Sequence, residues 1–213
     1  MIQINARSVA GEGKKVSAAE KLNLVSVEDY LAGELNSPIK HEYLGGVLHA
    51  TAGRRNLHNE IATNILVALG VRLHGTKCRP YNSDTKVRIQ LSMRVRFYYP
   101  DAFVVCRRNP PTDTFQDEPV AIFEVLSAKT RRLDDGEKKD AYLTIPSLNT
   151  YVLVEQDFPA LIVYRRTEDG FVPELLQGLD AGLPLPDLGI DLPLSAIYGG
   201  LELVPEAREG EPE

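Results

Sequence analysis

The spacing of apolar residues predicts a chain that mixes helices with strands. Leu57, Ile61, Ile65, Leu69 and Leu73 recur every four residues and form one apolar stripe, which predicts a helix over 57–73. Weaker patterns predict further helices, and each has its own boundary signal. They are a short helix capped by Ser26, a helix over 135–143 that stops before Pro146, and a short helix over 194–198.

Runs of alternating or continuous apolar residues predict strands between these helices. They cover a hairpin over 40–50 that turns at Gly45-Gly46, then 77–90, 95–106, 120–126, and a second hairpin made of 149–154 and 160–166. Strands that alternate with helices indicate a mixed α/β (α+β) fold. We predict one domain over residues 23–200, with a flexible polar leader over 1–22 and an acidic, frayed tail over 201–213.

Charge is distributed unevenly along this acidic chain, whose formal net charge is −6. Residues 72–108 carry nine Lys and Arg against two acids, a net charge of +7, whereas 168–213 carry a net charge of −10. A basic stretch of this kind can present one face to a polyanion. We therefore predict that Lys86, Arg88, Arg94 and Arg96 contact a nucleic-acid backbone; the alternative is an ordinary solvated strand surface.

The two cysteines, Cys78 and Cys106, are too few for a disulfide framework and lack zinc-ligand spacing to other cysteines or histidines. We expect two inert thiols in a reducing compartment and no structural zinc. No apolar run is long enough to span a bilayer, and residues 1–15 lack the features of a secretory signal. The sequence therefore predicts a cytoplasmic protein without a membrane partner.

Two isolated acids lie in apolar strands. Glu124 interrupts the apolar run 120–126, and Asp101 lies in a row with Phe97 and Phe103 at period two, directly after Pro100. A buried carboxylate is costly unless it is paired, protonated or bound to a cation. On neighbouring strands the two acids can bind one divalent ion such as Mg²⁺ or Mn²⁺. The alternatives are a structural salt bridge or two unrelated acids.

A cation that could assist phosphate chemistry comes from one of two lysines. Position 126, on the same strand face as Glu124, is a leucine and carries no charge. Lys138 recurs with Asp134 and Tyr142 every four residues, so these three side chains share one helix face. Lys129, just past the strand, is the other candidate, and an ordinary solvated lysine at position 138 is the alternative.

These residues, in this order, resemble the Uma2 family of the PD-(D/E)XK nuclease-like superfamily. The resemblance rests on Tyr99-Pro-Asp-Ala-Phe-Val-Val, Phe123-Glu-Val-Leu-Ser and Asp134-x-Gly-Glu-Lys138-x-x-x-Tyr142, supported by His41-Glu-Tyr-Leu-Gly-Gly, His58, Asp84-Thr-Lys-Val, Ile145-Pro-Ser-Leu, Tyr151-Val-Leu-Val and Leu192-Pro-Leu-Ser-Ala-Ile-Tyr198. It extends over residues 25–200, and the order and spacing of the motifs are more specific than any one of them.

The resemblance implies a restriction-endonuclease-like mixed β-sheet flanked by helices. It implies Asp101 and Glu124 as metal-binding catalytic residues and Lys138 as the catalytic lysine. Glu42 matches the acid before the glycine turn and could add a ligand; its alternative is an exposed hairpin acid. His58 fits a neutral histidine capping the start of its helix better than a general base. Asp134 and Tyr142 are possible accessory residues.

The function that follows is Mg²⁺- or Mn²⁺-dependent hydrolysis of phosphodiester bonds in nucleic acid, with DNA as the expected substrate and a homodimer as the expected form. Three alternatives stay open: a nucleic-acid-binding module that does not cut, a protein-interaction module with a decayed site, and a small-molecule hydrolase. No Gly-x-Ser-x-Gly elbow, nucleotide-binding glycine loop or histidine cluster supports the last.

Overall fold

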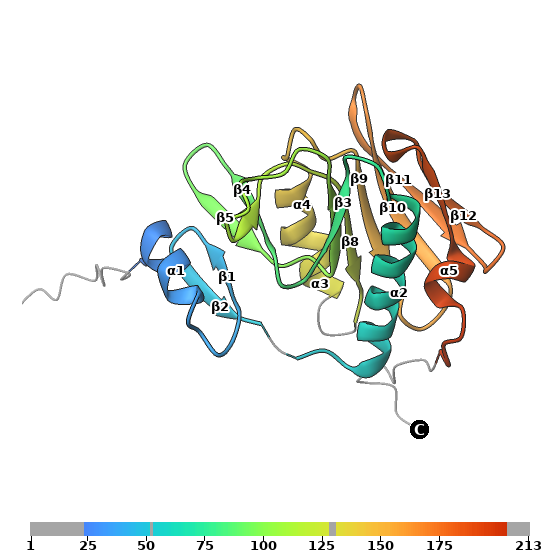
Figure 1. Ribbon diagram of the computed structural model, residues 1–213, viewed down its shortest axis with the longest axis horizontal. Coiled ribbons are helices and arrows are strands. Elements are labelled where there is room, and N and C mark those ends of the chain that lie inside the picture. The colour runs from blue at the N-terminus through green and yellow to red at the C-terminus, as the bar shows by residue number, and fades with distance from the viewer. Residues whose placement is uncertain (1–23, 52, 128–130, 204–213) are drawn as a thin grey trace, which may run out of the picture.

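Two mixed β-sheets form the framework of the protein (Figure 1). The computed structural model describes residues 24–51, 53–127 and 131–203. The amino-terminal sheet has the order β2-β1-β5-β4-β7 and the central sheet has the order β11-β10-β9-β8-β6-β3. Neighbouring strands are antiparallel except for the parallel pairs β4/β7 and β8/β9.

The strands are short, and their bounds show that the chain moves repeatedly between the two sheets. The amino-terminal sheet contains β1 (His41–Leu44), β2 (Val47–Ala50), β4 (Lys86–Gln90), β5 (Val95–Tyr98) and β7 (Phe115–Gln116). The central sheet contains β3 (Arg79–Asn82), β6 (Ala102–Val105), β8 (Pro119–Val125), β9 (Thr150–Val154), β10 (Ala160–Thr167) and β11 (Gly170–Gln177). A two-stranded ribbon of β12 (Gly182–Leu185) and β13 (Ile190–Pro193) follows, after which α5 (Leu194–Tyr198) comes last; the 3₁₀ turn η2 (Pro186–Leu188) joins the ribbon strands.

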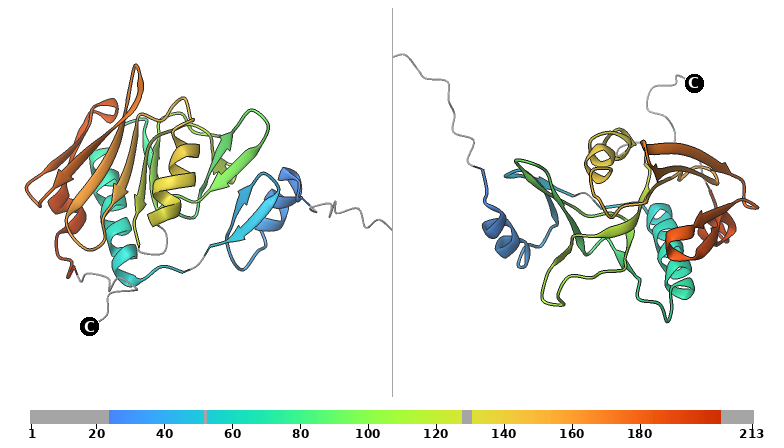
Figure 2. Two further views of the ribbon diagram at one scale, coloured as in Figure 1. Left: turned by 180° about the vertical axis from the view of Figure 1, so that it is seen from behind. Right: turned by 90° about the horizontal axis from the view of Figure 1, so that it is seen from above.

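Helices cover both faces of the central sheet. One face packs against α2 (Asn56–Arg72) and α5, and the other against the helical segment α3 (Arg131–Leu133), η1 (Asp134–Lys138) and α4 (Lys139–Tyr142). Figure 2 shows these two groups of helices on opposite sides of the sheet. The remaining helix, α1 (Val27–Glu34), packs on the amino-terminal sheet through an aromatic cluster of Tyr30, Tyr43, Phe97 and Phe115.

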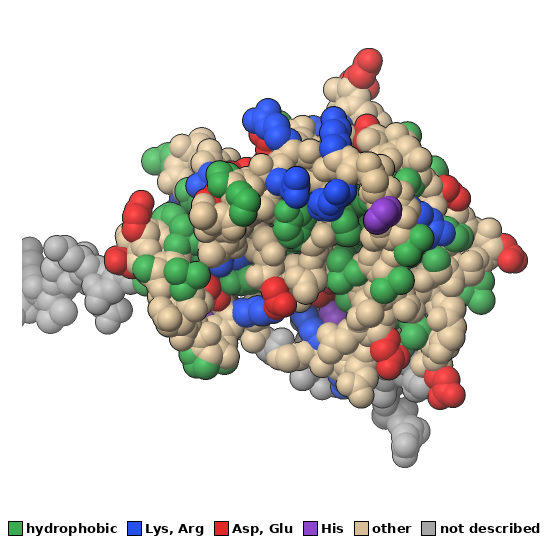
Figure 3. Space-filling view, in the orientation of Figure 1, with side chains coloured by type: hydrophobic (Ala, Val, Ile, Leu, Met, Phe, Trp, Pro, Cys, Tyr) green, Lys and Arg blue, Asp and Glu red, His purple; other side chains and the backbone are tan. Residues whose placement is uncertain are grey.

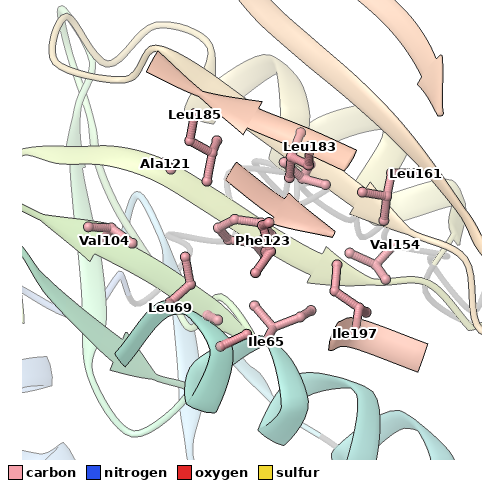
Figure 4. Packing of buried hydrophobic residues seen from close by; sticks show 14 of the residues in the cluster. Ile65, Leu69, Val104, Ala121, Phe123, Val154, Leu161, Leu183, Leu185 and Ile197 are labelled. Atoms are coloured by element: carbon pink, nitrogen blue, oxygen red, sulfur yellow. The ribbon is translucent and has the colours of Figure 1, made fainter. Parts of the chain in front are cut away.

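The predicted apolar stripe of α2 is confirmed. Ile61, Ile65 and Leu69 are fully buried in the cluster that contains Phe123 of β8. Figure 4 shows Ile65 and Leu69 on the same side of the sheet as Phe123. Burial of one such side chain stabilises the fold by about 1.5–3 kcal/mol. The helix is therefore held on the sheet firmly enough to fix the direction of His58, which lies three residues before Ile61.

The two longest predicted strands each break where the chain changes sheet. The strand predicted over 77–90 is β3 and β4, separated by a turn at 83–85. The strand predicted over 95–106 is β5 and β6, and residues 99–101 carry the chain across. The prediction that Phe97, Asp101 and Phe103 share one face is therefore wrong, since Phe97 packs near α1 whereas Phe103 packs near α4.

The helix predicted over 135–143 also differs from the prediction. Helical turns begin at Arg131, and Gly136, at φ −122° and ψ −106°, interrupts them between Asp134 and Lys138. Lys138 follows this break and is the N-cap residue of α4. Residues 128–130, which include the candidate Lys129, lie outside the described part of the chain, as do the predicted leader and residues 204–213 of the predicted tail.

The prediction of two free thiols is wrong, because Cys78 and Cys106 form a disulfide. Strands β3 and β6 pair with Arg79 opposite Val105, so the next residue outward on each strand is a cysteine. The pairing follows from the strand register, which the spacing of the cysteines did not reveal. It also removes the argument that the cysteines indicate a reducing compartment. Within the described ranges, no helix is long and apolar enough to cross a membrane.

Candidate active site

The two predicted carboxylates meet at the end of the β6/β8 pair where the chain enters β6 from the amino-terminal sheet. Strands β6 and β8 are antiparallel neighbours with Ala102 opposite Phe123, and Asp101 and Glu124 occupy the next position on each strand. Both side chains are buried, Asp101 at 6% and Glu124 at 0% exposure. The structure thus brings together two acids that are 23 positions apart in the sequence.

Protein donors bond both oxygens of Asp101. Oδ1 lies 3.0 Å from Nε2 of His58, and Oδ2 accepts a 2.8 Å hydrogen bond from the backbone N–H of Val125. Burial opposes ionisation of Asp101, but the hydrogen bond and charge of His58, the charge of Arg54 and the Val125 N–H together lower its pKa. Asp101 is therefore held as a carboxylate. The predicted capping role of His58 is wrong, because its imidazole points to Asp101 and its helix has no side-chain cap.

The surroundings of Glu124 favour its protonated form, in contrast to those of Asp101. Oε1 accepts a 3.2 Å hydrogen bond from the hydroxyl of Tyr142, whereas Oε2 is buried without a hydrogen-bond partner. Complete burial raises the pKa of Glu124 well above its ordinary value; Lys138 counteracts this, and the charges of Asp134, Asp101 and Glu42 add to it. An unbonded buried carboxylate oxygen costs free energy that a cation could recover.

Lys138 lies at the centre of an acidic cluster. Its Nζ is 2.8 Å from Glu42 Oε1, 3.4 Å from Asp134 Oδ1 and 3.7 Å from Glu124 Oε1. Burial disfavours its charge, but these three carboxylates outweigh burial and raise its pKa, so Lys138 stays protonated. The ammonium group also lies 5.6 Å from the ring centre of Tyr98.

The structure therefore gathers every candidate catalytic and accessory residue that it describes: Glu42, His58, Asp101, Glu124, Asp134, Lys138 and Tyr142 are all buried in one region. The alternatives of an exposed hairpin acid at position 42 and a solvated lysine at position 138 are wrong, because Glu42 is 6% and Lys138 1% exposed. Leu126 packs in the apolar cluster that also contains Tyr142, and the cation near Glu124 is Lys138 from the helical segment.

The donor set suits a hard divalent cation. Three carboxylates (Glu42, Glu124 and Asp134) lie within 4 Å of Lys138, and Asp101 is charged close to Glu124. Two of their buried oxygens, Oε2 of Glu124 and Oδ1 of Asp134, have no hydrogen-bond donor. Among the residues that the structure describes, no three His, Cys, Asp or Glu side chains are arranged as a complete metal-binding set. Mg²⁺ is commonly held by one or two carboxylates, with water and substrate phosphate supplying the other oxygens. Asp101 and Glu124 fit this pattern.

Two residues of the site carried no sequence signal. Tyr98 contributes the ring beside Lys138, and Arg54 lowers the pKa of Asp101 from a position four residues before His58. Arg54 lies before α2, outside its helical repeat, so the spacing of the helix does not connect it with the site. The role of Tyr98 depends on the break after β5, which alternation does not locate.

The four predicted backbone-contacting cations do not form one exposed basic face. Arg88 is paired with Asp117, Nε to Oδ1 at 2.6 Å, and Arg96 with Glu137 at 3.1 Å. Arg88 lies opposite Phe97 in the register, so Arg88 and Lys86 share the α1 side of the sheet, whereas Arg96 is on the other side with Tyr98. Lys86 is buried, and Arg94 is exposed in the turn between β4 and β5.

Comparison with known proteins agrees with this architecture. A family model, Uma2, described as "Putative restriction endonuclease", matches residues 27–195. The chain belongs to the Uma2 family. Two curated relatives come from Synechocystis sp.: the uncharacterized protein slr1290, 30% identical over 83% of this chain and 93% of its own length, and the uncharacterized protein sll1609, 28% identical over 62% and 76%.

A solved structure places this Uma2 protein among nuclease-like folds. The crystal structure of a protein described as a putative nuclease of the DUF820 family, from Anabaena variabilis, superposes with a TM-score of 0.62 at 16% identity. The match covers 79% of this chain and 96% of the other. At this identity the likeness shows the fold, and the predicted nuclease-like mixed sheet flanked by helices is confirmed.

Proposed function

We propose that this Uma2 protein is a metal-dependent endonuclease that hydrolyses phosphodiester bonds of DNA. The observation that carries the proposal is the buried pair Asp101 and Glu124, with the unbonded oxygen of Glu124 and the charged Lys138 beside it. The nuclease-like fold and the description of the family agree with this chemistry. Fold alone does not establish an activity, so the proposal depends on the site.

Each residue has a distinct role in this scheme. Asp101, kept ionised by His58 and the Val125 N–H, and Glu124 would hold Mg²⁺ or Mn²⁺. The bound ion would supply an activated water and polarise a phosphoryl oxygen. Lys138 stays protonated, so it acts as a fixed positive charge that orients Glu124 and offsets charge developing on the phosphate, and it is excluded as a general base.

The first test is calorimetric titration of Mn²⁺ into the wild-type protein and into Asp101→Asn and Glu124→Gln. We expect saturable binding to the wild type and its loss in both variants, because each removes one of two anionic ligands. Asp135→Asn is the matched control, since Asp135 is an acid of the same segment that pairs with Lys139 and lies 43% exposed by side chain. Binding that survives in Glu124→Gln would exclude this metal site.

Cleavage is then measured on supercoiled DNA with Mg²⁺ or Mn²⁺. We expect nicked or linear product with the wild type and the control, and none with Asp101→Asn, Glu124→Gln or added chelator. We also propose that the protein acts as a homodimer in the cytoplasm, since cutting both strands of a duplex requires two sites. Sedimentation analysis with and without DNA tests the dimer, and cell fractionation tests the location.

A second function is favoured by one observation: both oxygens of Asp101 already have protein donors. A site whose carboxylate is already hydrogen-bonded by the protein is compatible with a module that binds nucleic acid without cutting it. Such a module would bind DNA in the presence of chelator, and binding would weaken steeply with salt. Retained binding together with absent cleavage would favour this function over the endonuclease.

A further inference from the structure

A cavity of about 1080 Å³ lies on the α1 side of the amino-terminal sheet, away from the carboxylate site. Its walls come from the segment after α1, from β3 and β4, and from the loop between β6 and β7. In Figure 3, lysine and arginine side chains gather around the upper part of β3, and the surface is hollowed between there and α1. None of Asp101, Glu124 and Lys138 lines this cavity.

Lys86 is the buried cation of this cavity. It is 4% exposed, and it makes no hydrogen bond or ion pair within 24–51, 53–127 and 131–203. Its Nζ instead lies 5.4 Å from the ring centre of Tyr99 and 5.8 Å from that of Tyr30. Burial lowers the pKa of Lys86, and the charge of Glu34 only partly opposes this. An ammonium group that is largely withdrawn from water and has no carboxylate partner is costly, and an anionic ligand in the cavity would offset part of that cost.

The acids that line the cavity are already bound by other groups. Glu34 accepts hydrogen bonds from the Tyr99 hydroxyl at 3.0 Å and from the backbone N–H of His41 at 2.7 Å. Asp84 pairs with Lys40 at 2.5 Å. The lining contains three acids (Glu34, Asp84 and Asp113) against five cations, which are Lys40, Lys77, Arg79, Lys86 and Arg108. The cavity therefore has an excess of positive charge.

The rim adds free cations and an aromatic surface. Lys77 and Arg108 are exposed there, and neither makes an ion pair in the part of the chain that the structure describes. Tyr81 is half-buried and lines the cavity, with its ring stacked on Phe103 at 5.3 Å between centres and 15° between planes. Nucleic-acid-binding sites commonly combine such a supported ring, on which a base can stack, with cations for phosphate. The volume is at the upper end of the range for small-molecule sites.

We propose that this cavity binds a phosphate monoester carried on a nucleoside, with the phosphate on Lys86 and the base against Tyr81. The ligand is either a free mononucleotide or the terminal phosphate of a nucleic-acid strand, and the two share the same chemistry. The cavity shares no residue with the carboxylate site. The proposal therefore stands whether or not Asp101 and Glu124 bind a metal.

The test is calorimetric titration of adenosine 5′-monophosphate, with chelator present so that the carboxylate site plays no part. Adenosine is the probe without phosphate, and a short single-stranded oligonucleotide with or without a 5′-phosphate tests the strand end. Each is titrated into the wild type and into Lys86→Met, which keeps the length of the side chain and removes its charge. Lys139→Met is the matched control, because Lys139 pairs with Asp135 and lies outside the cavity.

We expect the mononucleotide or the 5′-phosphorylated strand to bind the wild type and the control. Lys86→Met should weaken binding about ten- to a hundredfold, the usual effect of losing a hydrogen bond to a charged group. Adenosine and the unphosphorylated strand should bind at least tenfold more weakly than their phosphorylated counterparts. Preference for one phosphorylated probe over the other identifies the source of the ligand.

Four results would overturn the proposal. They are no saturable binding of either phosphorylated probe to the wild type, equal binding by Lys86→Met, equal binding of adenosine, and an equal loss in Lys139→Met. Tyr81→Leu gives an independent check, because it keeps Lys86 and removes only the stacking surface. This variant should lose affinity for the mononucleotide while it keeps its weaker affinity for inorganic phosphate. Unchanged affinity for the mononucleotide together with lost affinity for inorganic phosphate would show that the base does not stack on Tyr81.

Discussion

Lys86 and Lys138 are buried to a similar degree, at 4% and 1% exposure, but their surroundings differ completely. Three carboxylates lie within 4 Å of Lys138, whereas Lys86 lies between two tyrosine rings without a carboxylate partner at that distance in the described residues. The pKa is accordingly raised for Lys138 and lowered for Lys86. Burial of a lysine therefore does not indicate its role; the charges that surround it do.

The two lysines also differ in whether their positive charge is already paired within the protein. Lys138 has a structural role in the site, because its charge and those of the surrounding acids compensate one another in a buried position. Lys86 lines a cavity and pairs with no carboxylate among the described residues, so its charge is available to a ligand there. Mutation of the two lysines should therefore affect different properties, stability in the first case and ligand binding in the second.

The largest expected difference is in the free energy of unfolding of Lys138→Met and Lys86→Met. Loss of Lys138 leaves Glu42, Glu124 and Asp134 buried without their cation, and we expect destabilisation of about 3–5 kcal/mol. Loss of Lys86 removes an unpaired charge, so the change should stay within about 1 kcal/mol or be stabilising. Urea denaturation at pH 7 measures both, with Lys139→Met as the control that removes a partly exposed ion pair at under about 1 kcal/mol. A large loss of unfolding free energy in Lys86→Met would show that Lys86 has a structural role too, and would contradict the proposed difference between the two lysines.

A smaller difference should separate the two carboxylates when both are measured in chelator. Asp101→Asn removes the charge that His58 and the Val125 N–H bind, and we expect a loss of about 1–3 kcal/mol. Glu124→Gln replaces an ionisable group in a fully buried position, so its effect on unfolding should stay within about 1 kcal/mol. Equal destabilisation by the two substitutions would contradict the different electrostatic balance described for the two acids.

The last difference is a pH dependence that Glu124 contributes to stability. Because its pKa is raised in the folded protein, Glu124 keeps its proton at pH values where the unfolded chain has already lost it. The folded state then binds more protons, so stability falls as pH rises from about 4.5 toward the raised pKa, by at most about 1.4 kcal/mol per pH unit. Glu124→Gln should lack this slope when unfolding is followed at several pH values. A wild type and variant with parallel profiles would show that Glu124 has an ordinary pKa.

Much of the site could be predicted because its acidic residues interrupt apolar segments of the sequence. Glu124 in an apolar strand and Asp101 after a proline are chemically out of place, and that signal survives without knowledge of the fold. The α2 helix could be predicted equally well, because its apolar stripe repeats over the whole length of the helix. In each case the relevant information lies within a few residues of the position concerned.

What could not be predicted depends on pairing between distant segments. The alternation over 77–90 and 95–106 continues across the points where the chain changes sheet, so the pattern does not show the break. Arg88 and Arg96 are neutralised by Asp117 and Glu137, and Cys78 meets Cys106 through the register of β3 and β6. The basic stretch of the sequence was real, but its charge count did not show which of its cations are paired with acids from outside it.

The repeated crossing of the chain between its two sheets has a consequence for how the protein can be divided. In sequence order, β1 and β2 belong to the amino-terminal sheet, β3 to the central one, β4 and β5 to the first again, and β6 to the second. No single cut between Asn82 and Ala102 yields two fragments that each contain a whole sheet. We therefore expect that split versions of this protein would have to reassemble from both halves, and that recombination between relatives would preserve this segment as one block.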